Sequence, residues 1–500
     1  MLFALAGAAL VPATSAGAAA GAAPAKAVTT TTVPAGKWDP RIEPIAKEVA
    51  KLRKLGFEHP VPVEFLSSKE FDKQVTVDAG KLTKQNKAAI AQQTARLAAI
   101  GLVPHTADLV QQQNDLQSSG VLALYVPQKK KVFVRGDALD SPAKKVTVAH
   151  ELTHALQDQH FDLQKLGEEA GKTHSVDAYK ALVEGDAVRV QDLYKKTLSQ
   201  ADQDQADQEN NAGATKAQDA ATSADVAPAL SVFQQAPYEF GPLMLQTVKA
   251  ANGESAIDDL FRNVPTNDLS YVLPTSLLDK TKIATVAAPK ANGKGEKQNG
   301  SADTFGSFAL YLVLSQQLSP ADALRIVDGW GGDAMIDYTR GTGDTKEQCV
   351  RATFAGQTSD DRHAIELGLT QWAAAQPAGS AEVTSVRDPL NPGGADLVQL
   401  SSCDVATPRA APLYDAMYAF VLAVTRNQLL SSYLEQGAPR NVAQCAADGV
   451  VRDETVQPIL EQSAKDPGAA PDAATLATLR SRVQDIVTSC VRTGKPGSTA

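Results

Sequence analysis

Apolar residues recur at helical spacing over residues 143–165, where no proline or glycine interrupts the chain. Their spacing is typical of one buried helix face: Val146, Ala149, Leu152, Ala155 and Leu156. Residues 176–198 show a similar pattern, with an apolar side formed by Ala181, Leu182, Val188, Val190 and Leu193. The pattern predicts two helices in this part of the chain.

Short runs rich in β-branched and aromatic residues predict strands elsewhere. Residues 121–125 and 131–135 are two such runs on either side of the turn 127–130, and they predict a hairpin. Two later strands are expected at 350–354 and 397–400, beyond a turn at 330–333. Helices are expected at 238–264, 304–318 and 410–495, and an extended stretch at 265–274. The sequence therefore predicts a predominantly helical α+β fold with a small sheet and a mostly helical C-terminal region.

Composition narrows the classes of partner. The chain has 500 residues and a net charge of −9, so it lacks the basic footprint that a nucleic-acid partner requires. Beyond the N-terminus no stretch of about 20 strongly apolar residues predicts a transmembrane span. A hydrophobic content of 43% with 21% charged residues is that of an ordinary folded protein.

The N-terminus reads as an export signal. Residues 2–11 are apolar, and small-residue sites such as Ala16-Gly17-Ala18 follow them. No lysine or arginine precedes Lys26, so the positive region of a signal peptide is missing. This leaves two alternatives, a true start upstream or an Ala-rich anchor. Residues 29–34 are expected to form a flexible linker.

The sequence His150-Glu151-Leu152-Thr153-His154 carries the most specific chemistry in the chain. Residues i and i+4 share one face of a helix, so the two histidines can bind one metal ion from the same side. Glu151 lies beside the first histidine and can reach a water on that metal. This layout is typical of zinc hydrolases, which need neutral nitrogen ligands, an open coordination position and a general base.

A third ligand is needed, and two solutions are open. His160 lies six residues after His154, but the glycine that lets the chain turn back at this point in metzincins is replaced by Gln157. The helix is therefore expected to continue past the metal. A carboxylate from the helix at 176–198 is the other solution. We expect Glu184 to be the third ligand and Asp186 to contact a histidine ring nitrogen. If Glu184 is not the ligand, His160, Asp158 or Asp186 takes its place.

The stretch HELTHALQDQHFD, followed some thirty residues later by ALVEGDA, resembles the gluzincin branch of the zincin metallopeptidases. More narrowly, the chain is similar to a poorly characterised family of secreted bacterial zinc metallopeptidase-like proteins. Further stretches that fit this family begin at residues 45, 101, 236 and 326, so the resemblance covers roughly residues 40–375. It implies a zincin-like catalytic region with His150, His154 and Glu184 as zinc ligands and Glu151 as general base.

The expected reaction is hydrolysis of a peptide bond, with one Zn²⁺ per chain and a peptide or protein as substrate. An oxyanion donor is expected as well; Tyr238 is the first candidate, and Tyr271 and His363 are others. In zincins a strand edge above the metal helix binds the substrate backbone, and the hairpin at 121–135 could provide such an edge or be purely structural. The alternative function is a zincin-fold binding or scaffold protein of the cell envelope with little or no turnover.

All four cysteines lie in the C-terminal third, at 349, 403, 445 and 490. An even number in an exported chain indicates two disulfides, and three pairings are possible. We expect Cys349–Cys403 and Cys445–Cys490, because each pair lies within one compositional block; four buried free thiols are the alternative. A cysteine zinc site is not expected, since no C-x-x-C spacing occurs. The disulfides and the signal together predict an extracellular or cell-envelope location.

Two polar stretches divide the chain. Residues 200–227 are acidic and nearly free of large apolar residues, and residues 290–301 are rich in glycine and lysine, so both are expected to be flexible. The predicted organisation is an export signal and linker at 1–36, a zincin-like catalytic region at 37–199, a linker at 200–227, the remainder of the peptidase-like region at 228–375 and a disulfide-bonded, mostly helical region at 376–500.

Overall fold

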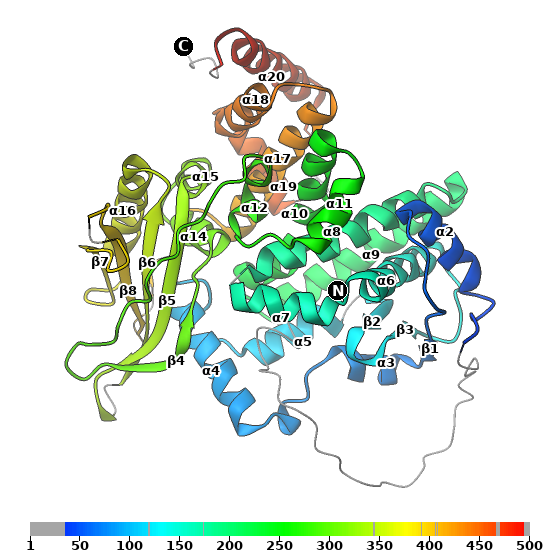
Figure 1. Ribbon diagram of the computed structural model, residues 1–500, viewed down its shortest axis with the longest axis horizontal. Helices are drawn as coiled ribbons and strands as arrows, with labels where there is room; N and C mark the ends of the chain where they lie inside the picture. The colour runs from blue at the N-terminus through cyan, green and yellow to red at the C-terminus, as the bar shows by residue number, and fades with distance from the viewer. Residues whose placement is uncertain are drawn as a thin grey trace. The chain divides into compact units, whose positions relative to one another are not determined.

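The structure is a computed structural model that describes residues 36–494, except 119–120, 174, 344–345, 392, 406, 408 and 467–470. The expected export signal lies outside the described residues. The fold is predominantly helical α+β with two small sheets, which confirms the predicted fold class (Figure 1). Among the described residues, no helix combines the length and the apolar character that crossing a bilayer would require.

The described residues form two compact units. Within the described residues, unit 1 draws on 36–93, Asp108–Lys172 and Val183–Val226, and unit 2 on Thr94–Ala107, Thr173–Leu182 and 227–494. Both units combine segments that are far apart in the sequence, whereas the predicted domains follow one another along the chain. The predicted boundaries stay predictions.

Elements of the first half of the chain supply unit 1, except that residues 94–107 and 173–182 belong to unit 2. They are α2 (Glu43–Arg53), β1 (Val63–Leu66), α3 (Ser68–Val75), η1 (Ala79–Lys81), α4 (Lys84–Ala99), α5 (Leu109–Ser118), β2 (Ala123–Val126), η2 (Pro127–Lys129), β3 (Lys131–Arg135), α6 (Pro142–Phe161), α7 (Leu163–Thr173), α8 (Val176–Lys195) and α9 (Gln200–Ser223). The strand order is β1-β3-β2, with β1 parallel and β2 antiparallel to β3. The predicted hairpin at 121–135 is therefore confirmed.

The small sheet places its two faces against different helices. Side chains alternate along each strand, so Ala123, Tyr125, Val132 and Val134 join one hydrophobic cluster with residues of α2 and α6. Leu124 and Phe133 point the other way and pack with Phe71 of α3. Helix α6 lies against the first face, and most of its residues are buried. The sheet thus fixes one side of the helix that carries His150-Glu151-Leu152-Thr153-His154.

Residues 200–227 are not a flexible linker, and that expectation is wrong for most of the segment. Residues 200–223 form α9, and the Ser199 side chain caps its start by accepting a hydrogen bond from the Asp202 N–H. Ala206 is fully buried against the core of unit 1, and the Glu209 carboxylate accepts a 3.3 Å hydrogen bond from the Ala143 N–H of α6. The segment is rich in alanine and glutamine, which favour helix without any large apolar side chain.

Unit 2 contains the remaining elements. They are α10 (Pro228–Asn252), α11 (Ser255–Arg262), α12 (Leu269–Val272), α13 (Thr275–Leu278), β4 (Lys297–Asp303), α14 (Ser307–Leu314), α15 (Pro320–Asp328), β5 (Trp330–Arg340), β6 (Glu347–Gly356), α16 (Ser359–Ala374), β7 (Ala381–Val386), β8 (Leu397–Asp404), α17 (Ala416–Glu435), α18 (Arg440–Arg452), α19 (Gln457–Lys465) and α20 (Ala473–Thr493). The sheet is antiparallel with strand order β4-β5-β6-β8-β7. The expected strands at 350–354 and 397–400 lie within β6 and β8.

Two local expectations in unit 2 are wrong. Residues 297–301, expected in a flexible loop, belong to β4, because backbone pairing with β5 needs no apolar side chains. Residues 269–272, expected to be extended, form the short helix α12, whose four residues are all buried. The helices expected at 238–264 and 410–495 are confirmed in outline by α10, α11 and α17 to α20.

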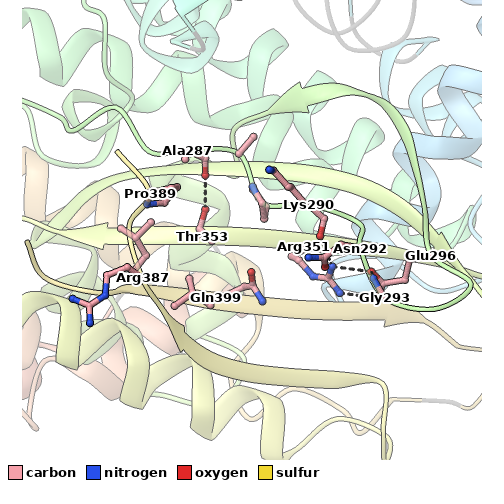
Figure 2. A pocket seen from close by; sticks show the side chains of 14 residues that line it. Ala287, Lys290, Asn292, Gly293, Glu296, Arg351, Thr353, Arg387, Pro389 and Gln399 are labelled. Carbon is pink, nitrogen blue, oxygen red and sulfur yellow. Dashed lines mark hydrogen bonds and ion pairs between the residues drawn. The ribbon is translucent and has the colours of Figure 1, made fainter. Parts of the chain in front are cut away.

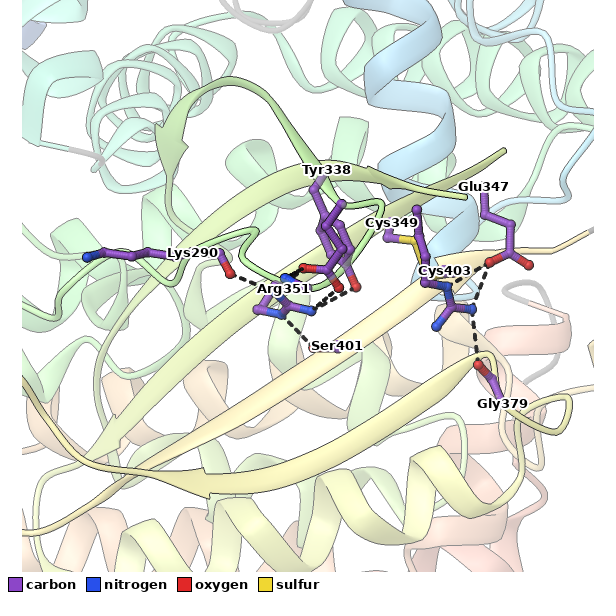
Figure 3. Close-up of polar contacts among 11 residues, drawn as sticks. Lys290, Tyr338, Glu347, Cys349, Arg351, Gly379, Ser401 and Cys403 are labelled. Atoms are coloured by element: carbon purple, nitrogen blue, oxygen red, sulfur yellow. Dashed lines mark hydrogen bonds and ion pairs between the residues drawn. A yellow bond between two sulfur atoms is a disulfide. The ribbon is translucent and has the colours of Figure 1, made fainter. Parts of the chain in front are cut away.

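Both predicted disulfides are confirmed. Cys349 of β6 and Cys403 of β8 are directly opposite in the strand register and are joined by a disulfide (Figure 3). Cys445 and Cys490 join α18 to α20. Helix α20 fully buries only Ile486 and Cys490, with Leu479, Val483 and Val487 partly buried against the same cluster, so the crosslink adds to a small apolar contact.

Replacing both Cys445 and Cys490 by serine should release α20. A native disulfide of this kind contributes about 2–5 kcal/mol, and α20 has little buried apolar surface to compensate. We expect hydrogen–deuterium exchange of the α20 amides to accelerate strongly, while the amides of β6 and β8 keep their protection. Unchanged exchange across 473–493 would show that packing alone holds this helix.

Candidate metal centre

Three side chains with metal-binding atoms converge inside unit 1. His150 and His154 lie one turn apart on α6, and Glu184 comes from α8. The two histidine Nε2 atoms are 3.0 Å apart, and each is 3.3 Å from the same Glu184 carboxylate oxygen. All three residues are only 3–4% exposed to solvent. The structure therefore brings together the three residues expected from the sequence.

These separations fit a tetrahedral zinc ion. Two ligand atoms that are each about 2.05 Å from one ion, at the tetrahedral angle, lie about 3.3 Å apart. The three observed separations of 3.0–3.3 Å match the edges of such a tetrahedron. Two imidazoles and one carboxylate are also a ligand set that zinc accepts, and they leave a fourth position for water. The residues present thus fit the implied metal in both chemistry and spacing.

Burial of the site favours the metal-binding form of one ligand. It lowers the pKa of His150, because a charged imidazolium is poorly solvated inside the protein. A neutral ring keeps a lone pair on nitrogen, which is what a metal ligand requires.

Local sequence explains why α6 runs through the site. The Ser141 side chain caps the first turn by accepting a hydrogen bond from the Lys144 N–H, and Pro142 occupies the first helical position. The helix continues without interruption past Gln157 and ends at Asp162, whose φ of 56° is left-handed. As expected from the absence of a glycine at 157, the chain does not turn back to bring a third histidine to the metal.

The alternative third ligands have other partners. The His160 ring contacts the Gly56 carbonyl at 2.7 Å in an exposed position. Asp158 accepts hydrogen bonds from the Tyr125 hydroxyl and the Lys130 ammonium. Of the described residues, His150, His154 and Glu184 are the set in this unit whose ligand atoms all lie within 4.8 Å of one another.

Glu151 lies between the metal ligands and the sheet. It is 1% exposed, and its Oε2 accepts a 2.6 Å hydrogen bond from the Tyr125 N–H of β2. In the described sheet β2 has a neighbouring strand only on the β3 side. The Tyr125 hydroxyl donates to Asp158, two helical turns beyond Glu151. Tyr125 therefore joins β2 to α6 through both its backbone N–H and its side-chain hydroxyl.

Asp186 does not make the contact that we expected from the sequence. Its carboxylate accepts hydrogen bonds from Gln157 Nε2 (3.0 Å) and Arg53 Nε (2.6 Å). The histidine ring nitrogen, Nδ1 of His154, instead contacts Gln157 Oε1 at 3.1 Å. The expectation is thus corrected: Gln157 stands between Asp186 and His154. Burial alone would raise the pKa of Asp186, but Arg53 and Arg189 outweigh it and lower that pKa.

Sequence reasoning missed Gln157, Tyr125 and Arg53. Gln157 could have been found, because position i+3 from His154 lies on the same helix face. Arg53 gives no such signal, since it is 133 residues from its partner Asp186.

The three oxyanion candidates belong to unit 2. Tyr238 lies in α10. Tyr271 of α12 is buried, and its ring packs at the edge of Phe240 and Phe308. His363 of α16 lies 3.6 Å from Glu366. Their role as oxyanion donors stays a prediction.

Unit 2 contains a groove of about 390 Å³ on the face of its sheet (Figure 2). Arg351 is the least exposed cation among its lining residues, and its guanidinium donates to both oxygens of Glu296 and to the Lys290 carbonyl. The groove's central positive charge is therefore neutralised by the protein itself.

A second group of possible ligand atoms, from Glu347, Cys349 and Cys403, lies near this groove (Figure 3). The two sulfur atoms are bonded to each other, so they offer no thiolate to a metal. Glu347 is paired with Arg340. This group is a disulfide beside an ion pair.

Comparison with known proteins gives no match of any kind: no family model, no curated protein and no solved structure is significantly similar to this chain.

Removing a proposed ligand should remove the metal. We expect the wild-type chain, dialysed against trace zinc and analysed by plasma mass spectrometry, to hold roughly one zinc per chain. His150→Ala, His154→Ala and Glu184→Ala should each hold far less, because two ligands cannot retain the ion against dialysis. His160→Ala is the matched control and should bind zinc like the wild type. Full zinc content in Glu184→Ala would rule out the third ligand assigned to α8.

Proposed function

We propose that this chain is an exported zinc metallopeptidase, which hydrolyses peptide bonds with Glu151 as general base. The observation that carries the proposal is the spacing of His150, His154 and Glu184, which matches a tetrahedral ion, with Glu151 adjacent on the same helix. A purely structural zinc site is closed by four protein ligands, whereas the candidate set here has three, and Glu151 follows the first of them on α6.

Zinc bound here would supply Lewis acidity and lower the pKa of a bound water towards neutrality. The residues of the chain do the rest. Glu151 accepts the proton of the attacking water and passes it to the leaving amine as the carbon–nitrogen bond breaks. The Tyr125 N–H holds the Glu151 carboxylate in place by a 2.6 Å hydrogen bond, so its position is fixed before substrate arrives. Burial of the ligands keeps bulk water away from the proton transfer.

The position of β2 supports a peptide as the substrate. This strand contacts the metal helix through Tyr125, and it has a neighbouring strand on one side only in the described sheet. An extended peptide can add to a sheet edge through backbone hydrogen bonds, with little demand on its side chains. In β2 this requires Ala123 to Tyr125, which are only 0–2% exposed, to be uncovered first. The substrate class would then be an extended segment of a peptide or protein.

The two disulfides support export. Both cysteine pairs are joined, and no described cysteine is free. Disulfides form and persist in oxidising compartments, which agrees with the expected signal at 1–36.

The second candidate is a zincin-fold binding or scaffold protein of the cell envelope. Unit 2 supports it, because its sheet carries a groove whose most buried charges, Arg351 and Glu296, neutralise each other instead of forming a reactive site. The presence of Glu151 favours the peptidase, since a binding protein has no need of a base next to the metal.

Glu151→Gln separates the two functions. This change removes the general base but keeps the shape of the side chain, so we expect casein hydrolysis to fall by about 10²–10⁴-fold while zinc content stays at the wild-type level. Wild-type hydrolysis should also stop on chelation and return when zinc is added. Glu168→Gln, at an exposed position on α7, is the control and should keep full activity.

Equal casein hydrolysis by wild type and Glu151→Gln would contradict the peptidase. A wild type that binds one zinc and cleaves nothing would favour the scaffold function.

A further inference from the structure

The feature that the proposed chemistry leaves unexplained is a buried chain of hydrogen bonds that leads away from the metal site. It runs from the His154 ring to Gln157, from Gln157 to Asp186 and from Asp186 to Arg53. Gln157 and Asp186 are fully buried, and Arg53 is 3% exposed. The chain of contacts joins three helices, α6, α8 and α2.

The partners of Gln157 define which way its amide points. Its Nε2 faces the Val183 carbonyl at 3.1 Å and the Asp186 carboxylate at 3.0 Å, and both of these atoms can only accept. The amide NH₂ must therefore point at α8, and Oε1 must point at His154. Since Oε1 can only accept, His154 carries a proton on Nδ1, and in the neutral ring that a metal ligand requires this is the only ring proton. The other nitrogen, Nε2, is left with a lone pair on the side of Glu184 and His150.

Asp186 prevents the amide from rotating. Its Oδ2 accepts hydrogen bonds from Arg53 Nε at 2.6 Å and Gln157 Nε2 at 3.0 Å, and its Oδ1 accepts one from Arg189 Nη2 at 2.8 Å. Turning the amide over would face an oxygen to two acceptors inside the protein. A buried polar group that loses its partner destabilises the folded state, so the observed orientation is preferred.

The same turn of α8 carries Glu184. Residues 183 and 186 contact Gln157, and Glu184 between them is the carboxylate of the metal site. Gln157 thus sets the spacing between the two helices at the point where each contributes a ligand.

We propose that Gln157 is a positioning residue, which fixes the tautomer and ring orientation of His154 and is itself held by Asp186 and Arg53. The inference rests on the proposed function only in that the site binds zinc. It does not require that the chain cleaves peptides. It also assigns a role to α2, because Arg53 of this helix donates the hydrogen bond that holds Asp186.

Two substitutions at 157 separate positioning from stability. Gln157→Leu removes the acceptor for His154, and we expect the zinc dissociation constant to rise by about 10–100-fold. Gln157→Glu keeps an oxygen for His154 but places a second carboxylate beside Asp186. We expect this variant to melt at a lower temperature than Gln157→Leu and yet to bind zinc more tightly. A merely structural role would make zinc affinity follow the melting temperature.

The measurements are competition with a chromophoric chelator for zinc affinity and the visible absorption of the cobalt-substituted protein. Gln157→Leu should change the cobalt bands, because they report the angle of the imidazole ligand, and Gln164→Leu at an exposed site on α7 should leave both readouts unchanged. Wild-type affinity and bands in Gln157→Leu would overturn the proposal.

The outcome is independent of the proposed peptidase activity. If the wild type binds zinc but cleaves no casein, and Gln157→Leu binds zinc more weakly, the result supports the positioning role of Gln157 and contradicts the peptidase. If the wild type cleaves casein and neither substitution at 157 changes zinc affinity, only the positioning role of Gln157 is contradicted. If Gln157→Leu does not fold, the zinc affinities of the wild type and Gln157→Glu are compared instead. A loss of zinc binding in Gln157→Glu as complete as in His154→Ala contradicts the positioning role.

Discussion

The structure of unit 1 depends on the convergence of two imidazoles and a carboxylate at one buried point. Burying such groups costs free energy. A folded chain keeps them inside only when they hydrogen-bond to one another or bind a cation. The nitrogen and oxygen atoms are 3.0–3.3 Å apart and lie on two neighbouring helices, so α6 and α8 cannot shift against each other without breaking the arrangement.

Helix α6 is buried on most sides, and its polar side chains are therefore matched one by one. Glu151 receives the backbone N–H of Tyr125 on the sheet side. Gln157 bridges to Asp186 on the side of α8, and Arg53 of α2 completes that contact. These matches hold the helix against the sheet, against α8 and against α2. The residues proposed as metal ligands and general base thus lie on a helix that is held on several sides, which is what accurate placement of such groups requires.

The sequence predicted the parts of this arrangement that are local. The spacing of His150 and His154 follows from helix geometry, and the replacement of a glycine by Gln157 correctly indicated that the helix continues. Glu184 could be predicted because its helix has a clear apolar pattern. Asp186 was expected to contact a histidine ring, but it contacts Gln157, which in turn contacts His154. This bridging role of Gln157 depends on how the two helices face each other. Arg53 could not be predicted, because nothing in a single sequence relates residues 133 positions apart.

The fold shows the same division. The helix α9 was missed because the prediction equated few large apolar residues with flexibility, whereas its alanines and glutamines favour helix and Ala206 packs into the core. The polar strand β4 was missed because its pairing with β5 uses backbone atoms. Both disulfides were predicted, since each joins two cysteines that lie within one compositional block of the sequence.

The most direct test of the central claim is X-ray absorption at the zinc edge on the wild-type chain loaded with one equivalent of zinc. Zinc bound by His150, His154 and Glu184 should show nitrogen and oxygen neighbours at about 2.0–2.2 Å, the outer-shell scattering of two imidazoles and no sulfur at about 2.3 Å. A chain that takes up no zinc, or a spectrum with one imidazole or with sulfur, would contradict the central claim.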